Sequence, residues 1–383
     1  MLKTFCLVFL SLFGVTALQA APPPKYSRQV IAYVFSPGAV LQPGQIDPHA
    51  VTRINYAFAN IQDGRVVLGH PNDSQNLALL TGLRKENRSL TILISVGGWL
   101  WSGQFSDAAL TEQSRQQFIQ SAIDFIGHYD LDGLDIDWEY PGLPGSGHAF
   151  RPEDGQNFNI LLKEIRARFN KESATTGRKL LLSIAAGAED DYIAHTGMAE
   201  AQKYLDTVNL MAYDYYEPGS SHTTGHHAPL FTNPADPLKI SADASVRAFR
   251  KAGVPAEKLV LGVPFYGHLW GEVNASNHGL YQPGKAVPNA YSPFSLIESS
   301  MLNQDFVRYW DPVSSAPYLY SSARHVFVSY EDEQSLAAKC HYILAHKLGG
   351  VMFWNYSNDS DGKLLNTIDS ELLHPVPQPG SHP

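Results

Sequence analysis

Eight short runs of β-branched, aliphatic and aromatic residues recur along the chain, and amphipathic stretches separate them. The runs cover residues 30–35, 53–61, 90–96, 131–140, 180–185, 208–213, 259–265 and 350–356. The stretches between them, such as residues 112–129, 154–169 and 243–251, are long enough for a crossover between parallel strands. Eight β-α units predict an α/β fold, the (β/α)8 or TIM barrel, in which functional residues lie at the carboxyl ends of the strands.

One interval between the predicted strands is too long for an ordinary loop, since about 60 residues separate the seventh run from the pattern that leads to the eighth. We expect the barrel to comprise residues 21–267 and 330–373, and residues 268–329 to form a small inserted α+β domain that makes one wall of a deep cleft. Within this insert, residues 279–282, 318–320 and 325–330 are predicted to be short strands. The Pro-rich residues 374–383 are expected to form a disordered tail.

The first residues have the pattern of a secretory signal peptide. Lys3 precedes an apolar run over residues 5–15, and small residues follow it, which predicts cleavage near Ala20 and a secreted or periplasmic protein. Cleavage also removes Cys6, so that Cys340 remains as a single cysteine. Loss of Lys3 takes the formal charge from −9 to −10, which argues against nucleic acid or an anionic membrane as a partner and favours a neutral polymer. We expect a monomer.

The segment Asp132-Gly133-Leu134-Asp135-Ile136-Asp137-Trp138-Glu139 places acids at alternate positions of a predicted buried strand. Asp135, Asp137 and Glu139 therefore point to one face, successive ones about 6.5 to 7 Å apart. Burial and like charge both raise carboxyl pKa values, so protons must be shared among the three. The row indicates proton chemistry, with Glu139 nearest the carboxyl end of the strand. Asp132 has the opposite parity and is interpreted as a structural acceptor near the strand start.

These residues resemble glycoside hydrolase family 18, the chitinases. The resemblance extends over residues 29–373 and rests on five ordered motifs: DGLDIDWE at 132–139, SVGGW at 95–99, MAYD at 211–214, GVPFYG at 262–267 and GGVMFW at 349–354. It implies hydrolysis with retention of configuration, in which the 2-acetamido group of the substrate, not a second carboxylate, attacks the anomeric carbon. The family is thus an exception to the usual pair of carboxylates.

The resemblance also implies a role for each residue of the site. Glu139 would protonate the leaving oxygen and later activate water. Asp137 would accept the acetamido N–H and exchange a proton with Asp135. Tyr213 would hydrogen-bond the acetamido oxygen, and Asp214 would help to position the sugar.

A second group of residues is predicted to bind the substrate. Trp354 would form the floor on which the reactive sugar stacks, and Gly98 would let the backbone come close to the ligand. The full set is Tyr33, Phe58, Gly98, Trp99, Met211, Tyr266, Met352 and Trp354. Trp138 lies on the face opposite the acids and is expected to pack against helices. For Trp101, Trp270 and Trp310 the sequence leaves open whether they are substrate platforms or packing.

Histidines raise the question of a metal. His222, His226 and His227 lie close together, but adjacent histidines diverge and no spacing suits zinc, so a polar loop is favoured. We expect no metal or organic cofactor. Relatives commonly have Arg where this chain has His268, which exchanges an always-charged group for an imidazole on one side of the cleft.

The sequence therefore predicts a secreted chitinase that cleaves β-1,4-linked N-acetylglucosamine polymers or oligomers. Two further enzymatic functions fit the same residues, an endo-β-N-acetylglucosaminidase and a peptidoglycan-directed hydrolase of the same family. A function of another class is a chitin-binding lectin without activity; such proteins typically lose the acid, whereas Glu139 is present. Endo or exo action is left open.

Overall fold

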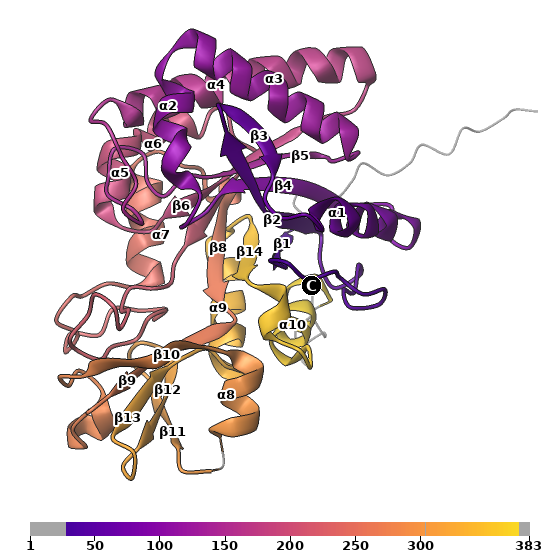
Figure 1. Cartoon of the computed structure of the whole chain (residues 1–383). Helices are drawn as coiled ribbons and strands as arrows, with labels where there is room; N and C mark the ends of the chain where they lie inside the picture. Colours follow the sequence, from indigo (N-terminus) through magenta and orange to yellow (C-terminus); the bar gives the residue numbers. More distant parts are fainter. Residues whose placement is uncertain (1–27, 303, 375–383) are drawn as a thin grey trace, which may run out of the picture.

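The computed structural model describes residues 28–302 and 304–374, and within them eight parallel strands close into a barrel (Figure 1). Strand β1 closes the ring because it pairs in parallel with both β2 and β14. The barrel strands are β1 (Gln29–Phe35), β2 (Arg53–Gln62), β4 (Thr91–Gly97), β5 (Gly133–Asp137), β6 (Leu181–Gly187), β7 (Thr207–Met211), β8 (Leu259–Pro264) and β14 (Gly350–Trp354). All eight predicted strands are confirmed, with ends that differ by a few residues.

Helices lie on the outside of the barrel and form most of the connections between successive strands, as parallel order favours, but residues 36–52 between β1 and β2 contain no helix and the last helix follows β14. They are α1 (Asp73–Gly82), α2 (Phe105–Leu110), α3 (Glu112–His128), α4 (Asp154–Thr176), α5 (Asp190–Thr196), α6 (Met198–Ala201), α7 (Ala242–Lys251), α9 (Glu333–His346) and α10 (Lys363–Ile368). Local sequence determines several helix ends: Thr111 and Asp332 each form a capping box at the start of a helix, and Gly177 ends α4 in the left-handed conformation.

A second, antiparallel sheet lies beside the barrel and is drawn in orange in Figure 1. It contains β9 (Tyr266–Gly271), β10 (Lys285–Pro293), β11 (Val307–Asp311), β12 (Ala316–Ser321) and β13 (Val326–Ser329), in the order β10-β9-β13-β12-β11. Helix α8 (Phe294–Ser300) packs against β9 and β10. The barrel therefore carries an additional α+β unit, as predicted.

The sequence predicts the strands of this unit only in part. The runs at 318–320 and 325–330 coincide with β12 and β13, but the strand predicted at 279–282 is wrong. That segment is a turn in which Tyr281 has a φ of +57°, outside the β region. A further hairpin strand, β3 (Arg65–Leu68), pairs antiparallel with β2.

The parity of β5 decides which side chains face the barrel interior. Leu134, Ile136 and Trp138 belong to the large apolar core between barrel and helices, where the Trp138 ring stacks on Phe105 at 5.3 Å. This confirms the prediction that Trp138 packs against helices. The alternate residues, Asp135 among them, point into the barrel. Because side chains alternate along a strand, β5 places its apolar residues in the outer core and its acids inside the barrel.

No helix in the described residues has both the length and the apolar character that a membrane crossing requires. The predicted signal peptide, residues 1–20, lies outside the described residues. So does the predicted tail, except for His374.

Candidate active site

A cavity of about 1120 Å³ opens at the carboxyl ends of the barrel strands and is bounded on one side by the second sheet. Most of the predicted site residues line it. These are Tyr33, Phe58, Trp99, Asp137, Glu139, Met211, Tyr213, Asp214, Tyr266 and Trp354. Three predicted residues are not on the lining: Asp135, Gly98 and Met352.

Asp135 lies below the cavity and is completely buried. Strand register places Ser95 of β4 and Ser183 of β6 directly beside it, and their hydroxyls donate hydrogen bonds of 2.8 and 2.6 Å. Tyr33 donates a third at 2.8 Å and Asn209 a fourth at 3.2 Å. Burial raises the pKa of Asp135, although the hydrogen bonds from Ser183, Ser95 and Tyr33 oppose the shift.

Asp137 lies above Asp135 at the end of β5 and has only 4% of its surface exposed. Its Oδ1 atom has no hydrogen-bond partner among the described residues. Burial raises the pKa of Asp137 well above its usual value, and the charges of Glu139 and Asp135 raise it further. A buried acid with one free oxygen, inside a cavity, is arranged to meet a polar group of a ligand.

Glu139 follows two residues after the end of β5, at the mouth of the barrel. Its backbone N–H donates to Ser102 Oγ at 2.9 Å, and that hydroxyl also lies 3.0 Å from the carbonyl oxygen of Asp137. The turn that carries the acid is therefore tied to the neighbouring loop. Burial raises the pKa of Glu139 to about 7; a hydrogen bond from Tyr140 opposes the shift, and the charge of Asp214 adds to it.

Tyr213, on the cavity lining, contacts Met352, which is not on the lining. The Tyr213 hydroxyl contacts Met352 Sδ at 3.9 Å, and a thioether is a weak acceptor, so the hydroxyl retains the capacity to donate to a ligand. Met352 itself is fully buried, and Gly98 supports the Phe58 ring, which lies 2.6 Å from the place a Cβ would take. Direct substrate contact by Met352 and Gly98 stays a prediction.

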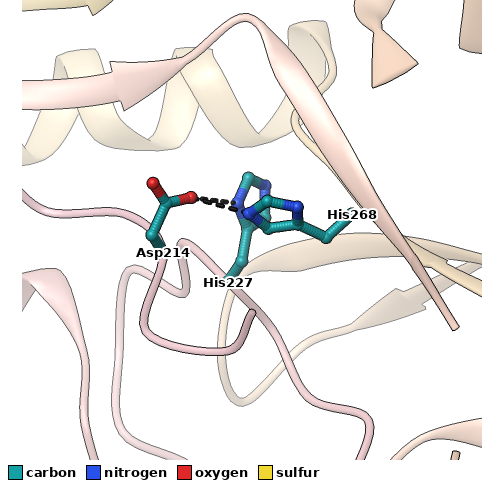
Figure 2. Close-up of side chains that lie close together, drawn as sticks. All are labelled: Asp214, His227 and His268. Atoms are coloured by element: carbon teal, nitrogen blue, oxygen red, sulfur yellow. Dashed lines mark hydrogen bonds and ion pairs between the residues drawn. The ribbon is translucent and has the colours of Figure 1, made fainter. Parts of the chain in front are cut away.

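Asp214 forms a cluster with two histidines (Figure 2). Its Oδ1 accepts hydrogen bonds from Tyr266 Oη at 2.7 Å and His268 Nε2 at 2.8 Å, and lies 3.6 Å from His227 Nδ1. The surrounding protein removes solvent from the carboxylate of Asp214, which would raise its pKa, but the neighbouring His227 and His268 outweigh this effect and hold the pKa below its usual value. His268 thus contacts the same carboxylate that the sequence assigns to the sugar.

No sequence signal marks His227 as a site residue, since its pattern indicates a polar loop. Its neighbour His226 pairs with a different acid, Asp311, at 3.3 Å, so the two adjacent rings diverge as expected. The second histidine beside Asp214 comes from β9, 41 positions later in the chain. The docking of the second sheet on the barrel loop brings them together.

Aromatic rings surround Trp354, the predicted floor. The Phe58 ring stacks on it at 5.5 Å with 20° between the planes, and Phe35 and Tyr33 approach at 5.4 and 6.0 Å. This packing fixes the indole and leaves part of it on the cavity wall. Trp99 is 48% exposed at the rim.

The three tryptophans that the sequence leaves open have different surroundings. Trp101 lines the cavity beside His70, at 5.1 Å between rings. Trp270 has a packing role and is not a substrate platform, because it is fully buried in the second sheet and its indole N–H donates to Ser221 O at 3.1 Å. Trp310 lies under the guanidinium of Arg308 at 5.6 Å, away from the cavity lining.

Other proteins are similar to this chain in sequence and in fold. The family model for Glycosyl hydrolases family 18 matches residues 29–359. The chain is 36% identical to chitinase A1 of Niallia circulans, over 85% of this chain and 55% of that protein, so it spans about half the length of that relative.

Solved structures agree with the family match. One is a family 18 N-acetylglucosaminidase from Paenibacillus barengoltzii, with a TM-score of 0.84 and 42% identity, covering 90% of this chain and 100% of that chain. Another is a chitinase from Bacillus thuringiensis, with a TM-score of 0.86 and 32% identity, covering 92% and 71%.

Proposed function

Because the chain belongs to family 18 of the glycosyl hydrolases, we propose that it is a chitinase that hydrolyses β-1,4 links between N-acetylglucosamine units with retention of configuration. The observation that carries this proposal is the pair Glu139 and Asp137. Glu139 is an acid on the cavity lining with a pKa of about 7. Asp137 is a buried acid beside it, and one oxygen of Asp137 has no hydrogen-bond partner among the described residues.

The raised pKa of Asp137 argues against a covalent glycosyl-enzyme. Burial and the neighbouring acids disfavour the ionised form of Asp137, whereas the usual retaining mechanism needs an ionised carboxylate as the nucleophile. The acetamido oxygen of the substrate can take that place. The carbonyl oxygen of the free Asp137 carboxyl can accept the acetamido N–H, and the Tyr213 hydroxyl can donate to the acetamido oxygen.

The proposed reaction has two steps. In the first, the bond between the anomeric carbon and the leaving oxygen breaks, Glu139 gives its proton to that oxygen, and the acetamido oxygen bonds to the anomeric carbon. In the second, ionised Glu139 takes a proton from water, whose oxygen displaces the acetamido oxygen from the same face as the departed group. Two inversions give net retention, and Glu139 recovers its proton.

A second candidate is an N-acetylglucosaminidase that releases single sugars. The 42% identity to the Paenibacillus barengoltzii enzyme, over the whole length of that chain, favours it over an N-glycan-directed or a peptidoglycan-directed hydrolase. The presence of Glu139 on the cavity lining, with a pKa suited to an acid, argues against a lectin without activity.

A time course of products from chitohexaose, with the anomers resolved, tests substrate, stereochemistry and mode together. A chitinase gives dimers to tetramers first, with β-anomers at the newly formed reducing ends, and an N-acetylglucosaminidase gives monomer from the first time point. A high-mannose glycopeptide serves as the matched second substrate. Cleavage of the glycopeptide alone, or α-anomers at the newly formed reducing ends, would contradict the proposal.

Export is part of the same proposal. We propose a secreted or periplasmic monomer, from the predicted signal peptide and the negative charge of the chain. Amino-terminal sequencing of the exported protein tests cleavage near Ala20, and light scattering tests the monomer. A mature protein that retains Lys3 would contradict this part.

A further inference from the structure

Asp214, His227 and His268 form a cluster of potential metal ligands at the wall of the cavity (Figure 2). One ligand atom from each residue lies within 4.8 Å of the other two. In the part of the chain that the structure describes, no other group of three or more such side chains is so arranged. We propose that these three residues form a binding site for a divalent transition metal, with Zn²⁺ as its representative.

The three ligand atoms are close enough to bind one ion together. Ligands on a tetrahedral zinc at bond lengths near 2.0–2.1 Å lie about 3.3 Å from one another. Asp214 Oδ1 is 2.8 Å from His268 Nε2 and 3.6 Å from His227 Nδ1, which are values on either side of that spacing. Small side-chain rotations would therefore place all three donors around one ion.

A second observation points to a ligand, and it concerns His227. This side chain is completely buried, yet neither ring nitrogen has a hydrogen-bond partner among the described residues. The 3.6 Å separation from Asp214 is too long for a hydrogen bond. Buried polar atoms are normally satisfied, and an ion bound between His227 and Asp214 would satisfy Nδ1.

The backbone holds the ligands in place, as metal sites require. The His227 N–H donates to Ser329 Oγ at 2.8 Å, and its carbonyl accepts from the Tyr215 N–H at 3.1 Å. His268 lies in the middle of β9, where it pairs with Tyr291 on one side and Ser329 on the other. Ser329 therefore links the two histidines.

Outer contacts and access also suit an ion. Tyr266 donates to Asp214 Oδ1 at 2.7 Å, which is the kind of outer hydrogen bond that orients a carboxylate ligand. Asp214 and His268 line the cavity, and 42% of the Asp214 side chain is exposed, so an ion can enter and a fourth position faces the cavity.

Two nitrogens and one carboxylate oxygen suit borderline ions such as Zn²⁺, Co²⁺ or Cu²⁺ over Mg²⁺ or Ca²⁺, which prefer oxygen alone. The ion would occupy the wall where Asp214 is expected to meet a sugar, so zinc and substrate would compete. The competition between zinc and substrate rests on the proposed function, whereas the binding of the ion does not. The site is inhibitory and supplies no step of the hydrolysis.

Cobalt and zinc titrations test the site. The purified protein, with a tag that contains no histidine, is freed of metal with chelator and titrated with CoCl₂, whose visible absorption reports N/O coordination. Zinc affinity is then measured by calorimetry with ZnCl₂. The variants are His268→Gln and His227→Gln, with Asp214→Asn as a third in case His227→Gln does not fold. His226→Gln is the matched control, because His226 is the adjacent residue and pairs with Asp311 instead.

We expect the wild type and His226→Gln to bind Co²⁺ with the same spectrum. His268→Gln and any folded variant at 227 or 214 should lose that spectrum and bind zinc at least about tenfold more weakly. Equal cobalt spectra in wild type and His268→Gln, or no uptake by the wild type, would overturn the site. If zinc inhibits the wild type and His268→Gln equally, zinc bound at this site does not compete with the substrate. That result would leave the proposed hydrolase function standing.

Discussion

The Tyr33 hydroxyl donates a 2.8 Å hydrogen bond to Asp135 Oδ2 across the interior of the barrel. The two residues are 102 positions apart, and only closure of the sheet brings β1 and β5 to face one another. Asn209 extends the contact, because its Nδ2 lies 3.1 Å from Tyr33 Oη and 3.2 Å from Asp135 Oδ1. The acid row therefore rests on a polar network that spans the barrel.

Tyr33→Phe removes one donor from buried Asp135. We expect a loss of about 1–3 kcal/mol in the free energy of unfolding, since the buried carboxyl of Asp135 loses one of its four hydrogen-bond donors. Turnover should also fall, because the pKa of Asp135 rises further and its proton is less available for exchange with Asp137. Denaturant unfolding and steady-state kinetics measure both effects.

Tyr342→Phe is the control for this variant. Tyr342 also donates to an aspartate, Asp243 at 2.9 Å, but between α9 and α7, away from the cavity. The Tyr342→Phe variant should have a lower free energy of unfolding than the wild type and the same kcat. Unchanged kcat in Tyr33→Phe as well would show that the network serves stability alone.

Glu139→Gln keeps the shape of the side chain and removes the proton that the leaving oxygen needs. We expect kcat to fall by about two to four orders of magnitude. The thermal unfolding midpoint should change little, and binding of chitotetraose, measured by calorimetry, should be largely retained. Hydrolysis at the wild-type rate would remove Glu139 from its proposed role.

Asp137→Asn tests the orientation of the substrate amide. Asp137 is neutral when protonated, so the amide preserves the charge of the site but changes which atom donates and which accepts. We expect a large fall in kcat and a small change in KM, because the interaction strengthens as the acetamido oxygen attacks. A rise in KM with kcat unchanged would instead identify Asp137 as a residue that only binds.

The pH dependence of turnover follows from Glu139, whose pKa is about 7. The reaction needs this group protonated, so kcat should fall about tenfold per pH unit above that value. The charge of Asp214 is one cause of the raised pKa. Asp214→Asn removes that charge, so Glu139 should ionise at lower pH, and the basic limb of the profile should move toward acid.

Asp311→Asn is the matched variant for the pH measurement. Asp311 is likewise paired with a histidine, His226 at 3.3 Å, but it belongs to the second sheet and does not line the cavity. Its profile should coincide with that of the wild type. A basic limb that stays in place in Asp214→Asn, or that moves equally in Asp311→Asn, would show that Asp214 does not set the ionisation of Glu139.

The barrel and the position of the acids follow from the amino-acid pattern, because both depend on local periodicity. Alternation along residues 133–139 places Asp135 and Asp137 on one face and Ile136 on the other in any strand, and eight β-α units of this length have few ways to pack. The family motifs lie at the carboxyl ends of strands. Because the barrel strands are parallel, these ends all lie at the same end of the barrel.

The surroundings of those acids come from long-range packing, which no local pattern predicts. The donors to Asp135 come from β1, β4, β6 and β7, and their contacts depend on barrel closure and strand register. The meeting of His227 with His268 depends on how the second sheet docks on the loop before α7. Residues 279–282 are predicted to be a strand but form a turn, in which Tyr281 has a positive φ and the backbone of Gln282 exchanges hydrogen bonds with Thr224, 58 positions earlier. Periodicity determines which face a side chain takes, while long-range contact determines its neighbours, its burial and therefore its pKa.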